Sequence, residues 1–295
     1  MNIWVAGARP RTLPAAVVPV LVGTATAAQG DLGAGRGIVA WRFVAAMVVA
    51  VAIQVGTNYA NDYADGVRGT DSPDRVGPVR LVGSGLAAPT AVKRAALLAF
   101  AVAAVAGSAL AIAVTPWLIL VGALSFAAGW LYTGGPRPYG YAGFGELFVF
   151  VFFGVVATVG SAFVQSETLT WLAFGASVPV GLFATALLVV NNLRDIPTDA
   201  AAGKRTLAVR LGEPATRVLY AVLMFLPFAT VPFVAGLGGR LLGAVALVAV
   251  LLVPKPVLAV LEGARGSALI PVLGVTGRVQ LVFGVLFAAG LWLSA

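Results

Sequence analysis

Cysteine and histidine are both absent from the 295 residues of the chain. Without cysteine, the protein has no disulfide, no thiolate nucleophile and no cysteine-ligated metal site. Without histidine, a catalytic triad of the serine–histidine type and histidine-ligated zinc or iron are excluded as well. Any chemistry must therefore rest on Asp, Glu, Asn, Lys, Arg and Tyr side chains.

Charge is also scarce, because only 10% of the residues are charged and 60% are hydrophobic. Soluble domains carry about 25% charged residues, so this chain cannot cover a water-facing surface. Runs such as Leu241–Val253 are apolar on every side. This favours membrane-spanning helices over the alternating strands of an outer-membrane barrel. The prediction is an all-α, polytopic helical bundle in which residues 1–295 form a single transmembrane domain.

Hydropathy, with Gly, Pro and charged residues as boundaries, predicts about nine spans. They lie near residues 12–29, 38–60, 92–113, 117–133, 144–164, 170–190, 216–236, 239–262 and 277–294.

The basic residues predict the orientation of these spans. With the N-terminus in the cytoplasm, all of the 19 basic residues except Arg36, Arg42 and Arg240 fall on the cytoplasmic side. Cytoplasmic loops of membrane proteins carry such an excess. The net charge of +8 is therefore interpreted as a topology signal and not as a nucleic-acid-binding surface. A multi-pass protein of the cell (plasma) membrane is expected, with its N-terminus and active site on the cytoplasmic side.

Six of the seven aspartates gather at two predicted cytoplasmic helix ends. They are Asp62, Asp65, Asp71, Asp74, Asp195 and Asp199. Asparagine and glutamine accompany them at three- and four-residue spacing, which places the side chains on one helix face. These companions are Gln54, Asn58 and Asn61 in the first cluster and Asn191 and Asn192 in the second. Polar groups inside membrane helices are costly and usually functional, although Asp and Asn also serve as ordinary helix caps.

Carboxylate and amide oxygens without His or Cys are the ligands of Mg²⁺, Mn²⁺ or Ca²⁺. Basic residues follow both clusters and would hold a diphosphate that completes the shell of a magnesium ion. They are Arg68, Arg75 and Arg80 after the first cluster, and Lys204 and Arg205 after the second. The pattern predicts diphosphate chemistry.

The two clusters resemble the aspartate-rich motifs of the UbiA superfamily of intramembrane prenyltransferases. Residues 58–65 read NYANDYAD and continue with GVRGTD to Asp71, while residues 191–199 read NNLRDIPTD and are followed by GKRTLAVRLG to Gly212. The spaced first motif, the paired asparagines and the loop YTGGPRPY at 132–139 are most similar to the MenA-type 1,4-dihydroxy-2-naphthoate polyprenyltransferases.

This resemblance implies a UbiA-like fold and a Mg²⁺-dependent reaction in the bilayer. A polyprenyl group would pass from polyprenyl diphosphate to 1,4-dihydroxy-2-naphthoate with loss of CO₂ and diphosphate, giving demethylmenaquinol in menaquinone biosynthesis. No nucleic-acid partner is expected.

The resemblance also implies roles for individual residues. The catalytic, metal-binding carboxylates would be Asp62, Asp65, Asp195 and Asp199, with Asp71 as a further metal ligand. Diphosphate contacts would come from Asn61, Arg68, Arg80, Asn192, Arg194 and Lys204. The aromatic acceptor would meet Tyr132, Arg137, Tyr139 and Glu146, with Arg137 facing its carboxylate.

Two alternatives remain open at this stage. The acceptor could be another aromatic compound, such as 4-hydroxybenzoate or homogentisate. From another class, a cation-coupled secondary transporter also uses intramembrane Asp and Asn residues. A transporter would place its polar site near the middle of the bilayer, whereas both clusters here lie at predicted cytoplasmic helix ends, which favours an enzyme.

Overall fold

The computed structural model describes residues 2–30, 35, 37–70, 77 and 79–295. Throughout this part of the chain the regular structure is helical, and no strand occurs. The elements are α1 (Ile3–Ala8), η1 (Pro10–Thr12), α2 (Pro14–Ala27), α3 (Ala40–Arg68), α4 (Pro89–Ala113), α5 (Trp117–Leu131), η3 (Tyr139–Ala142), α6 (Gly145–Val149), η4 (Phe150–Val156), α7 (Ala157–Ser166), α8 (Trp171–Ala201), α9 (Leu207–Leu237), η5 (Leu241–Leu252), α10 (Pro254–Leu261), η6 (Gly266–Ala268) and α11 (Leu269–Leu293).

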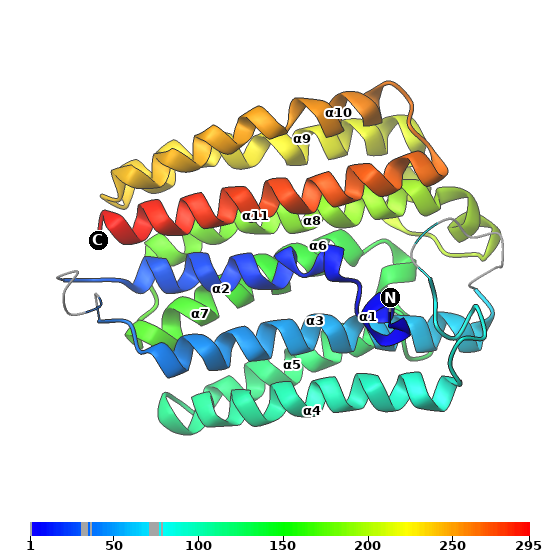
Figure 1. The fold of residues 1–295 in the computed structure, drawn as a ribbon, viewed down its shortest axis with the longest axis horizontal. Coiled ribbons are helices and arrows are strands. Elements are labelled where there is room, and N and C mark those ends of the chain that lie inside the picture. Colours follow the sequence, from blue (N-terminus) through cyan, green and yellow to red (C-terminus); the bar gives the residue numbers. More distant parts are fainter. Residues whose placement is uncertain (1, 31–34, 36, 71–76, 78) are drawn as a thin grey trace.

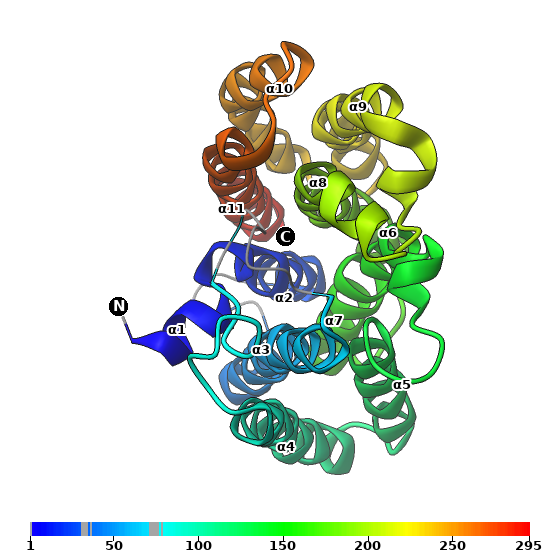
Figure 2. The same ribbon diagram turned by 90° about the vertical axis from the view of Figure 1, so that its right-hand side faces the viewer.

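The long helices run side by side along the longest axis of the molecule (Figure 1). Seen end-on, α2 lies near the centre, with α3, α7 and α11 around it and α4, α5, α9 and α10 further out (Figure 2). Helices satisfy their own backbone hydrogen bonds, which is what a chain of this hydropathy requires in lipid. The predicted all-α membrane bundle is confirmed.

Six helices are long and apolar enough to cross a membrane, and the pair η5 and α10, bent by 41°, would make a seventh span. The apolar helices α2 and α5 are shorter than a full span. Every predicted span overlaps helix in the described residues, but the count of nine is not confirmed by length and composition.

Two helices continue well past the C-terminal ends that hydropathy predicted. Helix α3 continues to Arg68 instead of residue 60, and α8 continues to Ala201 instead of residue 190, through Pro197. Hydropathy falls where the aspartates begin, so an apolarity criterion ends the span there, although the backbone remains helical. Both acidic motifs are therefore held on rigid helices.

Helix α8 packs closely against the wide turn η4, which is a π-helical segment. A Cβ atom added to Gly154 would lie 2.6 Å from the Cα of Gly181, so only glycine allows this approach. Such π-helical turns inside helices often occur at functional sites. Here the turn places Phe152 and Phe153 on the wall of the cavity described below.

Candidate active site

One cavity of about 870 Å³ opens along the inner face of α3. Its polar end holds Asp65 and Lys204, and its apolar end reaches Ala46 and Val164. The 19 residue steps from Ala46 to Asp65 correspond to roughly 28 Å of helix. The cavity thus joins an ionic site at the loop end of the bundle to a long apolar interior.

Asp65 is the centre of the ionic site and is only 2% exposed. Its Oδ1 accepts hydrogen bonds from Lys204 Nζ at 3.1 Å and from the Tyr141 hydroxyl at 2.5 Å. Arg80 Nη2 lies 3.7 Å from its Oδ2. Burial, together with the negative charge of Asp65, raises the pKa of Tyr141, so this phenol stays protonated and donates to the carboxylate.

Lys204 connects the two acidic motifs. Its ammonium group lies between Asp65 Oδ1, at 3.1 Å, and Asp199 Oδ1, at 3.8 Å. It also lies 4.7 Å from the ring centre of Tyr141. The motifs on α3 and α8 therefore face each other across the ammonium group of Lys204.

In the second motif, Arg194 and Asp195 form a buried pair. Arg194 donates from Nε and Nη2 to the two carboxylate oxygens, each at 2.8 Å, and Nη2 also donates to Asn191 Oδ1 at 2.9 Å. Asn192 donates to Glu146 Oε1 at 2.9 Å. Both asparagines, Arg194 and Asp195 line the cavity.

Asp62 has a different environment from Asp65, although it belongs to the same motif. It is 0% exposed, and its two oxygens accept the backbone N–H groups of Leu81 and Val82 at 2.8 and 3.0 Å. Within the described residues it is not part of the cavity wall. Its carboxylate fixes the loop that carries Arg80.

The other predicted phosphate-contacting residues of the first motif also differ in whether they line the cavity. Asn61 lines the cavity, where its Oδ1 accepts the hydroxyl of Thr133 at 2.7 Å. Arg68 is exposed and donates to the carbonyl groups of Thr133 and Gly135. The predicted residues Asp71, Asp74 and Arg75 lie outside the described residues.

Of the four predicted acceptor-binding residues, Tyr132 and Tyr139 line the cavity. Tyr139 stacks on Phe148 with ring centres 4.0 Å apart. Arg137 is exposed and does not reach the wall that the described residues form. Glu146 is buried behind Asn192 and holds that amide in place.

Several wall residues were not predicted as site residues. They are Arg9, Arg11 and Thr12 from the N-terminal turn, Tyr141 from η3, and Phe148, Phe152 and Phe153 around the π-helical turn. The two arginines carry charge next to an apolar segment, which sequence reasoning used only for orientation.

The oxygen-rich donor set fits a magnesium ion bound together with phosphate. No group of three or more acidic side chains in the described ranges could hold a metal ion alone. Asp65, Asp195, Asp199 and the amide of Asn61 nevertheless face one cavity end, next to Arg80 and Lys204. Magnesium usually takes one or two carboxylates and completes its shell with water and substrate phosphates.

The sequence profile of the UbiA prenyltransferase family matches residues 16–265. The chain belongs to this family. A 1,4-dihydroxy-2-naphthoate octaprenyltransferase of Mycobacterium tuberculosis is 50% identical over 98% of this chain and 96% of its own length. The enzyme of the same name from Bacillus subtilis is 32% identical over 97% and 91% of the two chains.

Solved UbiA structures share the fold of this UbiA-family chain. The apo structure of a UbiA homologue from Aeropyrum pernix superposes with a TM-score of 0.71 at 14% identity, covering 94% of this chain and 97% of the other. A homologue from Archaeoglobus fulgidus, bound to DMAPP and Mg²⁺, superposes with a TM-score of 0.64 at 13% identity, covering 98% of each chain. The UbiA-family chain is a multi-pass membrane protein.

Proposed function

We propose that this enzyme transfers a polyprenyl group from polyprenyl diphosphate to 1,4-dihydroxy-2-naphthoate, with loss of CO₂ and diphosphate, and so makes demethylmenaquinol for menaquinone synthesis. The observation that carries the proposal is the continuity of the carboxylate–cation site with the apolar cavity. One end suits a diphosphate, and the other suits an isoprenoid. The 50% identical mycobacterial naphthoate octaprenyltransferase supports the same acceptor.

The diphosphate would bind between Arg80 and Lys204, with Arg194 nearby on α8. Arg80 and Lys204 now lie beside carboxylates of the two motifs. Asp65, Asp195 and Asp199 would hold Mg²⁺, and Asn61 and Asn192 would complete or orient its shell. When bound, Mg²⁺ neutralises negative charge on the departing diphosphate. Asp62 would act through the loop that it holds.

The transfer needs no reactant other than the donor and the acceptor. The allylic C1–O bond breaks, and its electron pair leaves with the diphosphate. The electron-rich ring forms a bond to C1, and the bond between the ring and the carboxylate breaks with its electron pair remaining on the ring, so that CO₂ departs. Arg80 and Lys204 stabilise the charge that grows on the diphosphate, because preorganised cations act strongly in a site from which water is excluded.

We further propose that the ionic site faces the cytoplasm of a plasma-membrane enzyme. The ends of α3 and α8 that carry the two motifs lie at the same end of the bundle as the N-terminal helix α1 (Figure 1). The asymmetry of basic residues favours a cytoplasmic position for this end. The donor and the acceptor would then both be supplied from that side.

The test is to incubate the purified protein with Mg²⁺, octaprenyl diphosphate and a panel of aromatic acids, and to identify the products by mass. A product that has gained the prenyl group and lost CO₂ is expected with 1,4-dihydroxy-2-naphthoate. Prenylation of 4-hydroxybenzoate alone, with its carboxylate retained, would overturn the acceptor assignment.

Removal of divalent cations is expected to lower turnover at least 100-fold, because diphosphate departure needs charge neutralisation. Turnover would be measured after EDTA treatment and again after Mg²⁺ is restored. A matched sample that receives EDTA already saturated with Mg²⁺ controls for the chelator itself. Full activity in excess EDTA would contradict the metal assignment.

Arg137→Ala is expected to change the apparent KM for the acceptor by less than about twofold, because its side chain is exposed and away from the cavity wall. The KM values for acceptor and donor would be measured separately in membranes. Arg80→Ala is the comparison, since it should weaken donor binding and raise the KM for the prenyl donor. A tenfold rise in acceptor KM for Arg137→Ala would instead support the role that sequence resemblance implied.

A further inference from the structure

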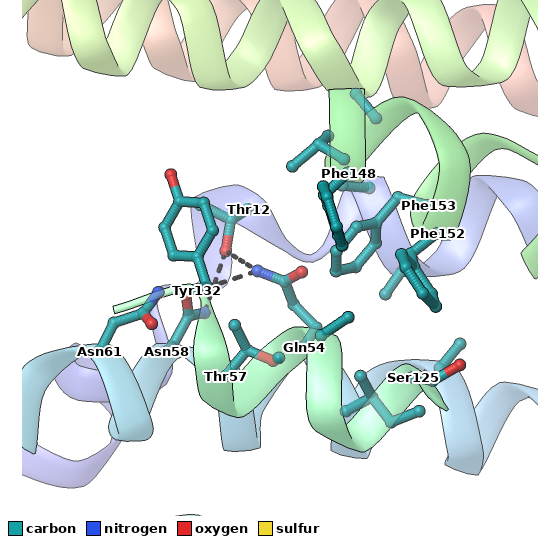
Figure 3. Close-up of a pocket in the computed structure, with 18 of the residues that line it drawn as sticks. Thr12, Gln54, Thr57, Asn58, Asn61, Ser125, Tyr132, Phe148, Phe152 and Phe153 are labelled. Carbon is teal, nitrogen blue, oxygen red and sulfur yellow. Dashed lines mark hydrogen bonds between the residues drawn. The ribbon is translucent and has the colours of Figure 1, made fainter. Parts of the chain in front are cut away.

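A second polar cluster lies deeper in the cavity than the ionic site. It consists of Gln54 and Asn58 on α3 and Thr12 at the end of η1 (Figure 3). Gln54 is only 8% exposed, and its side chain lines the cavity. The eleven residue steps from Gln54 to Asp65 correspond to roughly 16 Å along the helix. The proposed diphosphate site makes no use of this cluster.

The hydrogen bonds of the cluster fix the role of every group in it. The Thr12 hydroxyl donates its only proton to the carbonyl oxygen of Arg9 at 2.9 Å. It can therefore only accept from the two amide groups that approach it, Gln54 Nε2 at 3.0 Å and Asn58 Nδ2 at 3.2 Å. Asn58 Nδ2 also donates to the carbonyl oxygen of Ala8 at 3.0 Å.

This pattern determines which way the Gln54 amide points. Its nitrogen must face Thr12 and the Asn58 oxygen, which lies 3.5 Å away. Its oxygen consequently points away from Thr12, towards the side where Phe148 and Phe153 lie (Figure 3). Among the described residues, no hydrogen bond reaches Gln54 Oε1. A hydrogen-bond acceptor with a fixed orientation is thus presented to the cavity.

Such an acceptor selects the chemistry of its ligand. A carboxylate or a phosphate is itself only an acceptor and would be repelled, whereas a hydroxyl group donates a proton. An isoprenoid diphosphate has no donor in its tail, so it cannot satisfy Gln54. A phenolic hydroxyl on an aromatic ring can do so.

The opposite wall suits an aromatic ring. Phe148 stacks on Tyr139 with ring centres 4.0 Å apart and on Phe152 with ring centres 6.0 Å apart. Aromatic side chains favour stacked or edge contacts with further rings. The length of helix between Gln54 and Asp65 leaves space for a bound diphosphate followed by a bicyclic ring.

We propose that Gln54 Oε1 accepts a hydrogen bond from a ring hydroxyl of the aromatic acceptor and thereby determines acceptor specificity. This inference rests on the proposed function and deepens it. One ring hydroxyl of the acceptor lies against Gln54 and Phe148, with the carboxylate-bearing carbon of the same ring towards the diphosphate. Thr12 and Asn58 are positioning residues, because they act only by holding the amide.

The test compares Gln54→Met with the wild-type protein, using competitive inhibition by two naphthoates that each lack one of the two hydroxyl groups. Inhibition reports binding, so a loss of ring reactivity in the analogues does not matter. Groups that hydrogen-bond a substrate hydroxyl reject analogues that lack it. The wild type is expected to bind one of the two analogues about 10- to 100-fold more weakly than the dihydroxy compound, and Gln54→Met should reduce this ratio to within about twofold.

Two further variants make the result specific. Ser125→Ala is the matched control, because this cavity-lining hydroxyl is already bonded to the carbonyl oxygen of Val121 at 2.8 Å, and the ratio should not change. Thr12→Val removes the group that orients the amide, so the ratio should fall several-fold while Gln54 is intact. It also replaces Gln54→Met as the test if that variant does not fold.

The inference would be overturned if the ratio of analogue binding to dihydroxynaphthoate binding in Gln54→Met or Thr12→Val equalled the wild-type ratio. It would also be overturned if the KM for the prenyl donor rose as much as the KM for the acceptor. The proposed function fails separately, if the wild-type protein does not convert dihydroxynaphthoate with loss of CO₂.

Discussion

Asp65→Asn is expected to lower turnover by about 10³-fold at saturating Mg²⁺ and donor, the scale on which active-site electrostatic groups act. The substitution keeps the shape of the side chain and removes its charge. Asp65 is where Lys204, Arg80 and the Tyr141 hydroxyl meet. Asp195→Asn, on the facing motif, should have a loss of similar size. Product formation in membranes with matched protein levels measures both.

The control is Glu167→Gln, which removes a half-exposed carboxylate paired with Arg42 at 2.8 Å. That change also removes one negative charge from an ion pair, but outside the cavity, so turnover should remain at the wild-type level. If Asp65→Asn retained more than about a tenth of wild-type turnover, the carboxylate could not be carrying metal-assisted departure of the diphosphate.

Asp62→Ala is expected to lower both stability and turnover, for a reason different from that of Asp65→Asn. It leaves the buried N–H group of Leu81 and the partly buried N–H group of Val82 without their charged acceptor. Hydrogen bonds to charged groups contribute about 1.5–3 kcal/mol each, so the loss should be about 3 kcal/mol or more. Thermal unfolding in detergent should shift downward by several degrees.

Ser84→Ala is the matched control in the same loop, where the exposed hydroxyl donates to the carbonyl oxygen of Arg80. It should leave both measurements near the wild-type values. An Asp62→Ala protein that unfolds at the wild-type temperature yet is inactive would instead indicate a direct metal ligand. The structural role of Asp62 and the metal-binding role of Asp65 can thus be distinguished by the measurement of thermal stability alone.

Composition was sufficient to predict a helical membrane bundle, because a chain with so little charge has few other ways to satisfy its backbone in lipid. The extents of α3 and α8 were not predictable in this way. Their last turns carry Asn and Asp residues, which hydropathy treats as loop. The backbone stays helical there because neighbouring loops and side chains bond to those residues, as Leu81 and Val82 do to Asp62.

The candidate site was predictable to the extent that its residues share a motif. The spacing of Asn61 and Asp65 on one helix indicates a common face, and both line the cavity. The contacts that join distant segments carry no such signal. Lys204 meets Asp65 across 139 residues, and Thr12 meets Gln54 across 42. Arg137 lies in a motif-like loop, but its direction depends on tertiary packing that no local pattern encodes.

The size of the cavity bears on how the protein treats substrates of different length. At about 870 Å³ it is comparable with a pocket for one drug-sized ligand, too small for both a bicyclic acid and a long polyprenyl chain. Its wall includes apolar residues on the outer surface of α5, such as Ile119, which is 63% exposed.

Distal isoprene units would therefore remain among the lipid chains before, during and after catalysis. Moving a methylene group from one hydrocarbon environment to another yields almost no free energy, unlike its removal from water. Beyond the few isoprene units that fit inside the cavity, lengthening the donor should then alter its affinity for the protein very little. The lipid chains of the bilayer would accommodate the additional isoprene units.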